Sequence, residues 1–158
     1  MLFSLFKKQT KFQLVEIGRE KPSPCNDYVN VIVYDMVVNN RVVGICDLRI
    51  GFNENIYYAG NIGYQVYERY RGNGYAYKAC LELLKVAQEL KMDKLYITCS
   101  PENIASKKTI EKLDVKLLEI VQVPSNHWLY KRNEKVKCIY EINLGDNNGK
   151  QVEETIDQ

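Results

Sequence analysis

The sequence has almost no histidine and no closely spaced pair of cysteines. It contains one histidine, His127, and five cysteines, which are spread along the chain without a Cys-x-x-Cys motif. We therefore expect no zinc site and predict no bound metal. An odd number of scattered cysteines also argues against a disulfide framework and favours a reducing cytoplasm.

Long apolar runs are absent as well. No stretch of about eighteen apolar residues occurs, so we expect no membrane-spanning helix and no membrane partner. The apolar opening, residues 1–6, is too short for a signal peptide and lacks the basic region that precedes one. These features predict a cytoplasmic protein.

Neither sign of charge dominates the sequence. The chain carries 22 basic and 20 acidic residues, a formal net charge of +2, so nucleic acid is not an expected partner. Its 158 residues, 46% hydrophobic and 27% charged, fit one soluble domain with a single core. We assign this domain to residues 1–144 and expect the polar, acidic tail at residues 145–158 to be disordered.

The pattern of apolar residues predicts many strands and two helices. The expected strands are residues 12–17, 28–38, 41–50, 56–67, 94–99, 115–123 and 136–144, and the expected helices are residues 74–91 and 103–113. Asn39 and Asn40 tolerate positive φ and predict a hairpin turn, whereas the segment 18–24, which contains prolines, predicts a loop. The helical crossover should place strand 94–99 parallel to the strand before the helix. The predicted fold class is mixed α/β (α+β), with a single, mostly antiparallel sheet flanked by helices.

The strongest functional signal is the segment from Arg71 to Ala76, with the sequence RGNGYA, which connects an expected strand to an amphipathic helix. A glycine-bearing turn at a helix start leaves several backbone N–H groups unpaired, and the helix dipole adds positive potential there. Gly72 and Gly74 allow left-handed angles and close approach of a ligand. The turn is therefore suited to phosphate oxygens. Its spacing alone fits an ordinary strand-to-helix connection equally well.

Two other glycine-rich phosphate motifs do not fit this segment. A P-loop ends in Gly-Lys followed by Ser or Thr, whereas Gly74 is followed by Tyr75 and Ala76. The dinucleotide fingerprint needs a third glycine at the position of Tyr77, and it opens a parallel αβ series. The strands that flank the segment have an antiparallel pattern instead.

The order of strand, Arg-x-x-Gly-x-Ala turn, helix, strand, Asn-bearing helix and paired strands resembles the GNAT superfamily of acetyl-CoA-dependent N-acetyltransferases. The family motif, Gln/Arg-x-x-Gly-x-Gly/Ala, cradles the pyrophosphate of the cofactor, and Arg71, Gly74 and Ala76 match it here. The resemblance covers residues 28–144. The phrases DLRIG, at residues 47–51, and GYQV, at residues 63–66, are similar to those of a bacterial branch of the superfamily.

The resemblance implies that acetyl-CoA is the co-substrate. In this reading the strand end at residues 64–66 splays from its neighbour at a bulge, and its free backbone groups pair with the pantetheine arm. The N–H of Val66 would polarise the thioester carbonyl, and Asn103 would hold the pantetheine and help position the thioester. Asn103 could instead be a plain helix N-cap. The implied cofactor-binding residues are Tyr64, Gln65, Val66, Arg71, Gly72, Asn73, Gly74, Tyr75, Ala76, Asn103 and Ser106.

The chain departs from the family at the acceptor side. Many relatives have two helices between the first strand and the hairpin, where this chain has only a short segment with Pro22 and Pro24. The acceptor pocket is therefore expected to be more open, or completed by the N-terminal segment or by another chain, as in a homodimer. Asp47 and Arg49 share one face of an expected central strand, where charges need partners. They are candidate substrate contacts, unless they pair with neighbouring strands.

The second departure concerns the general acid. Many relatives carry a tyrosine seven residues after the helix asparagine, where this chain has Ile110, which cannot donate a proton. Tyr130 is the first candidate substitute, unless it only packs at a hairpin mouth, and His127 has a pKa suited to proton transfer.

The sequence as a whole predicts an enzyme. We expect direct acetyl transfer from acetyl-CoA to a primary amine of a small-molecule or peptide acceptor, without an acetyl-cysteine intermediate. The alternative is a non-catalytic acyl-CoA-binding sensor or interaction module on the same fold. The missing acid at Ile110 and the short segment before the hairpin favour that alternative.

Overall fold

A computed structural model describes residues 10–145 of the chain, so most of the expected disordered tail and most of the N-terminal segment lie outside the described residues. The strands form two antiparallel sheets, with orders β1-β2-β3-β4 and β5-β7-β6. The strands are β1 (Phe12–Glu20), β2 (Asn30–Val38), β3 (Arg41–Ile50), β4 (Ile62–Val66), β5 (Lys94–Cys99), β6 (Lys116–Gln122) and β7 (Val136–Asn143). The helices are α1 (Glu54–Ala59), α2 (Tyr75–Glu89), α3 (Ile104–Glu111) and α4 (Trp128–Lys131).

The predicted fold class is confirmed, with a correction to the sheet. Strand β5 does not extend the first sheet as a parallel neighbour of β4, because it pairs antiparallel with β7 in a sheet of its own. The two sheets meet at Asn61, just before β4. Its N–H donates to the carbonyl of Tyr96 at 2.7 Å, and its side-chain oxygen accepts from the Tyr96 N–H at 2.8 Å. Within residues 10–145, no ladder joins β4 to β5 beyond this junction.

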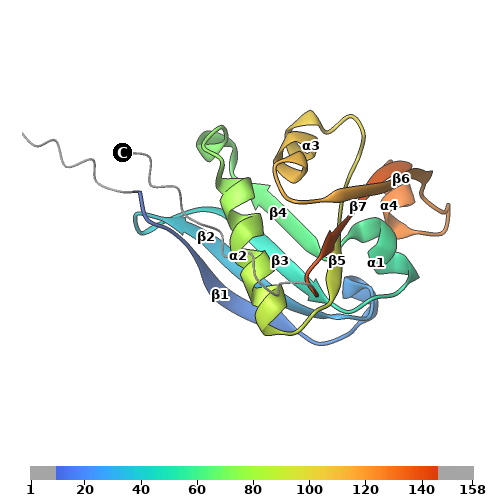
Figure 1. Cartoon of the computed structure of the whole chain (residues 1–158), viewed down its shortest axis with the longest axis horizontal. Coiled ribbons are helices and arrows are strands. Elements are labelled where there is room, and N and C mark those ends of the chain that lie inside the picture. The colour runs from blue at the N-terminus through green and yellow to red at the C-terminus, as the bar shows by residue number, and fades with distance from the viewer. Residues whose placement is uncertain (1–9, 146–158) are drawn as a thin grey trace, which may run out of the picture.

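Helix α2 covers one face of the four-stranded sheet (Figure 1). Its inward residues, Cys80 and Leu83 among them, are fully buried against alternate residues of β3 such as Cys46 and Leu48. Burial of apolar surface stabilises this packing. Because side chains alternate along a strand, Asp47 lies on the opposite face of the sheet.

Two local expectations were confirmed and two were wrong. Asn39 and Asn40 form the β2–β3 turn, with φ of 49° and 64°, and α2 lies within the predicted helix. The predicted strand 56–67 is instead helix α1 followed by β4. The side chain of Asn53 accepts a hydrogen bond from the Ile56 N–H at 2.9 Å, and this N-cap outweighs the strand propensity of the segment. The predicted loop 18–24 begins too early, because β1 continues to Glu20 beyond a bulge.

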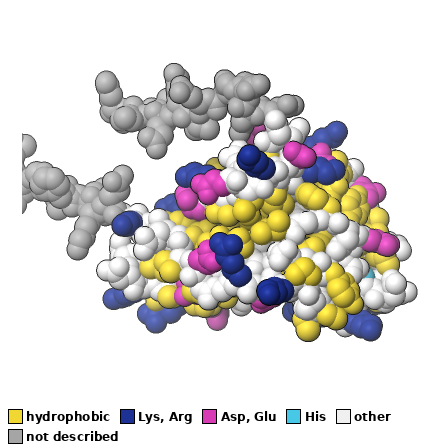
Figure 2. Space-filling view, turned by 90° about the horizontal axis from the view of Figure 1, so that it is seen from below, with side chains coloured by type: hydrophobic (Ala, Val, Ile, Leu, Met, Phe, Trp, Pro, Cys, Tyr) yellow, Lys and Arg dark blue, Asp and Glu magenta, His cyan; other side chains and the backbone are white. Residues whose placement is uncertain are grey.

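Within the described part of the chain, no helix is long and apolar enough to span a membrane. The same residues contain no cluster of three or more metal-ligating side chains. Figure 2 shows basic and acidic side chains interspersed on the face seen from below, with hydrophobic side chains between them.

Candidate active site

The turn before α2 has the backbone geometry of an anion site. Gly72 and Gly74 have φ of 82° and 72°, in the left-handed region that glycine adopts without strain. Gly74 is the N-cap residue of α2 and supplies no side-chain cap, so the N–H groups of the first turn stay available. The side chain of Arg71 donates to the Val66 carbonyl at 3.2 Å and ties the turn to the end of β4.

These residues line a cavity of about 580 Å³ between α2, α3 and the end of β4. Every predicted cofactor-binding residue except Asn73 lines it; the side chain of Asn73 instead donates to the Tyr70 carbonyl at 2.9 Å and braces the turn. The lining residues are Tyr64, Gln65, Val66, Tyr70, Arg71, Gly72, Gly74, Tyr75, Ala76, Asn103, Ala105, Ser106, Lys108, Thr109 and Lys112. We call this the cationic cavity, because its lining includes three basic side chains and no acidic one.

Two of those basic residues, Lys108 and Lys112, were missed by the sequence analysis. They lie four residues apart, a spacing that places two side chains on one side of a helical turn. That spacing was visible in the sequence, but only the packing of α3 beside the turn shows which side faces the cavity.

Strand β4 has a free edge at the cavity. In an antiparallel ladder, alternate residues exchange backbone hydrogen bonds with the partner strand. Two such bonds join the segment around β4 to β3. The Arg49 N–H donates to the Asn61 carbonyl at 2.7 Å, and the Tyr67 N–H donates to the Val43 carbonyl at 2.9 Å. Residues 61 and 67 therefore bond to β3, and so do the odd-numbered residues between them. The backbone N–H of Val66 is therefore directed away from β3, toward the side on which no ladder joins β4 to β5.

Two further cavity residues come from the N-terminal part of α3. The side chain of Asn103 accepts a hydrogen bond from the Ser106 N–H at 3.1 Å, so Asn103 is the helix N-cap and also lines the cavity.

Ile110 is fully buried in the core and supplies no proton donor. Burial raises the pKa of Tyr64 to about 12, although the hydroxyls of Ser106 and Thr109 act in the opposite direction.

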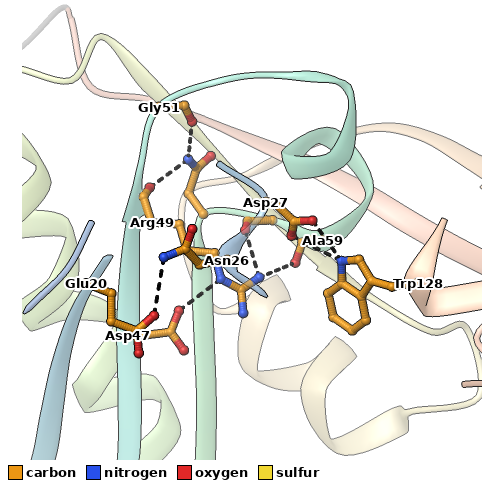
Figure 3. A network of polar contacts seen from close by, with 10 residues as sticks. Glu20, Asn26, Asp27, Asp47, Arg49, Gly51, Ala59 and Trp128 are labelled. Carbon is orange, nitrogen blue, oxygen red and sulfur yellow. Dashed lines mark hydrogen bonds and ion pairs between the residues drawn. The ribbon is translucent and has the colours of Figure 1, made fainter. Parts of the chain in front are cut away.

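A second cavity, of about 540 Å³, lies on the other face of the four-stranded sheet. It is lined by Glu20, Pro24, Cys25, Asn26, Asp27, Val31, Val33, Asp47, Arg49, Trp128 and Arg132, and we call it the acceptor-side cavity. Asp47 and Arg49 both line it, and they also pair with each other, with Nε and Oδ1 3.1 Å apart (Figure 3). Burial raises the pKa of the Asp47 carboxyl, and the Arg49 guanidinium opposes this shift.

The carboxylate of Asp47 lies over β4. Its Oδ2 is 2.6 Å from the position that a β-carbon on Gly63 would occupy. Any side chain at position 63 would therefore displace it. Asp47 pairs in register with Gly63, three residues before Val66 on β4.

The structure does not bring the predicted proton donors to either cavity. Tyr130 lines neither one, and its ring lies under the amine of Lys135, with 5.2 Å between Nζ and the ring centroid. The buried His127 ring accepts from the Leu129 N–H at Nδ1 and contacts the Asn55 carbonyl through Nε2, each at 3.1 Å. Both ring nitrogens are therefore used within the protein. Both residues belong to helix α4 or its N-cap, in the segment that connects β6 and β7.

Comparison with known proteins agrees with this geometry. Residues 10–116 match the family model of the acetyltransferase (GNAT) domain, and the chain belongs to this acetyltransferase family. It is similar to a GNAT-family acetyltransferase from Bacillus anthracis, with 25% sequence identity and a TM-score of 0.58 over 71% of this chain and 66% of that one. The comparison with curated proteins gave no match.

Two further solved structures share the fold at lower identity. One is the microcin C7 self-immunity acetyltransferase MccE in complex with acetyl-CoA and AMP, with 17% identity and a TM-score of 0.55 over 72% of this chain and 61% of that one. The other is the Salmonella typhimurium acetyltransferase that modifies the N-terminal serine of ribosomal protein L7/L12, with 16% identity and a TM-score of 0.55 over 72% of this chain and 63% of that one. The chain thus spans less than two thirds of the length of all three structures.

Proposed function

We propose that this GNAT-family protein transfers an acetyl group from acetyl-CoA to a primary amine by direct attack. The observation that carries the proposal is the cationic cavity, where Arg71, Lys108 and Lys112 surround the unpaired N–H groups of α2. Coenzyme A is polyanionic, and both the helix N-terminus and the basic side chains favour its phosphates. The free edge of β4, which borders the same cavity, offers backbone partners to the amides of a pantetheine arm.

The reaction needs an unprotonated amine. Asp47 is the half-buried carboxylate beside β4, and its raised pKa makes it a suitable acceptor for the proton of an incoming ammonium group. The nitrogen then attacks the thioester carbon, while the Val66 N–H stabilises the negative charge that develops on the carbonyl oxygen. The C–N bond forms, the C–S bond breaks, and the nitrogen releases its second proton to solvent. Because Ile110 offers no proton, the sulfur leaves as a thiolate that takes its proton from solvent.

The buried cysteines do not support a covalent intermediate, and Cys25, which is exposed, lines the acceptor-side cavity and not the cationic cavity. Cys46, Cys80 and Cys99 are buried, and burial raises their pKa values to about 12, about 12 and about 11. The thiol, not the reactive thiolate, is therefore present at neutral pH. Both substrates should be bound together when transfer occurs.

A second candidate function is acyl-CoA binding without turnover, and the buried Ile110 favours it. Release of free CoA thiol over a panel of amines distinguishes the two functions. A catalyst releases CoA with at least one amine, whereas a binding module is stabilised by acetyl-CoA but releases none. Under either function, acetyl-CoA at a concentration a hundredfold above its Kd should stabilise the protein by about 2.7 kcal/mol. Absence of thermal stabilisation by acetyl-CoA would contradict both functions.

A further inference from the structure

The acceptor-side cavity has its own distribution of charge. Successive side chains of a strand point to opposite faces of the sheet. Asp47 and Arg49 of β3 alternate with residues that pack in the core, so the cavity that they line is on the sheet face opposite α2. Its lining contains three carboxylates and two guanidinium groups, whereas the cationic cavity contains no carboxylate. The two cavities therefore suit ligands of different charge.

The end of the acceptor-side cavity next to β4 is anionic. The Asp47 carboxylate lies over the bare backbone of Gly63, and Glu20 is close enough to raise the pKa of Asp47 further. The Arg49 guanidinium is occupied, because it pairs with Asp47 and its Nη1 lies 3.4 and 3.3 Å from the carbonyls of Ala59 and Gly60 (Figure 3). Arg49 therefore braces Asp47 and is not available to an anionic ligand.

The side of the cavity formed by α4 and the residue after it presents the Trp128 ring and the Arg132 guanidinium, with the Asp27 carboxylate beside the indole. The indole N–H of Trp128 donates to both carboxylate oxygens of Asp27, at 2.9 and 3.1 Å, and this contact fixes the ring (Figure 3). The guanidinium carbon of Arg132 lies 5.7 Å from the centroid of the indole. Arg132 forms no ion pair with any residue in the described range 10–145. Of the two guanidinium groups that line the cavity, the guanidinium of Arg132 therefore remains available to a ligand.

We propose that the acceptor is a small amine that carries its own carboxylate, a proposal that rests on the acetyl transfer proposed above. The reacting amine must lie beside Asp47, whose carboxylate attracts its ammonium form. Glu20, on β1 at the other edge of the sheet, lines the same cavity and adds to the negative potential at Asp47. The carboxylate then pairs with Arg132, whose planar fork matches two carboxylate oxygens. The carbon chain between the two groups lies against the exposed part of the Trp128 ring. Arg132 is thus a specificity-determining residue.

The test uses ω-amino acids of increasing chain length, each compared with its ω-amino amide and with the alkylamine of the same length. We expect kcat/KM to be about tenfold or more higher for the best amino acid than for its amide, as hydrogen bonds to charged groups contribute about 1.5–3 kcal/mol. Arg132→Gln should remove this preference, so that the amino acid and its amide are acetylated with similar kcat/KM. Arg41→Gln, at an exposed position that lines neither cavity, is the matched control.

Three outcomes would overturn the proposal. The first is a preference for alkylamines or diamines over amino acids, and the second is a carboxylate preference that survives Arg132→Gln. The third is binding of acetyl-CoA without acetylation of any compound in the series. Release of CoA thiol over the broader panel of amines separates these failures from failure of the proposed function, because in the latter case no amine releases CoA.

Discussion

Asn61 and Tyr96 hold the two sheets together through a reciprocal pair of backbone and side-chain hydrogen bonds, at 2.7 and 2.8 Å. The side-chain amide of Asn61 also donates to the carbonyls of Arg49 and Gly51, both at 2.9 Å. Asn61 is fully buried, so one side chain satisfies backbone groups on three segments. Beyond this junction β4 and β5 share no ladder, and that separation leaves the free edge of β4.

Asn61→Ala should therefore destabilise the protein strongly. The change leaves a buried N–H and two buried carbonyls without their partner, and each unsatisfied group costs about 1–3 kcal/mol. We expect the free energy of unfolding in urea to fall by at least about 2 kcal/mol. Asn73→Ala, which removes an exposed asparagine, is the control and should cost much less. Equal losses in the two variants would contradict the role of Asn61.

The phosphate turn is tested by a matched pair at position 74. Asn and Asp are nearly isosteric and both tolerate the φ of 72° at this position, so they differ chiefly in charge. A β-carbon on Gly74 would meet no protein atom within 4 Å. Gly74→Asp should weaken acetyl-CoA binding in calorimetry by tenfold or more relative to Gly74→Asn, since a carboxylate repels phosphate. Equal affinities would show that the pyrophosphate binds elsewhere.

Gly63→Ala tests the position of the Asp47 carboxylate. The added β-carbon would lie 2.6 Å from Asp47 Oδ2, so the carboxylate must move. We expect kcat/KM for the acceptor amine to fall by about tenfold or more, the lower end of typical acid–base contributions, with acetyl-CoA affinity retained. Gly18→Ala, on β1, is the control, because its β-carbon would have no neighbour within 4 Å. Unchanged acceptor kinetics would remove Asp47 from the site.

Asp47 also predicts a pH dependence of stability. Its pKa in the folded protein is raised above the ordinary value of 3.8, chiefly by burial. Between these two pKa values the folded state binds more protons than the unfolded state, so this group lowers the free energy of unfolding as pH rises above about 4. Asp47→Asn removes the effect. The difference in unfolding free energy, variant minus wild type, should become more positive from pH 3.5 to pH 7, and a constant difference would contradict the raised pKa.

The buried thiols predict the kinetic order and their own reactivity. Initial-rate plots against both substrates should intersect, and parallel lines would indicate a covalent intermediate. In the native protein only Cys25 should react promptly with a thiol reagent at pH 8, because it is the exposed cysteine and the other four are buried. All five should react after denaturation. A fast second thiol in the native protein would show that the burial is incomplete.

The features that sequence predicted well are local. The turn at Asn39 and Asn40 depends on two adjacent residues that tolerate positive φ, and α2 depends on apolar spacing along one segment. The first part of the segment 56–67 was predicted wrongly because Tyr57 and Tyr58 favour a strand, whereas the chain forms a helix capped by Asn53.

The sequence by itself determined the glycine turn at the start of α2, because its backbone geometry and its unpaired N–H groups depend only on neighbouring residues. Only the tertiary structure decided what surrounds that turn. Lys108 reaches the cationic cavity through the packing of α3, and Asp47 lies near the free edge because Gly63 leaves room on the adjacent strand. The packing of the elements also places Tyr130 against Lys135, outside the linings of both cavities. Contacts between residues far apart in the chain depend on how whole elements pack, and no local pattern encodes that packing.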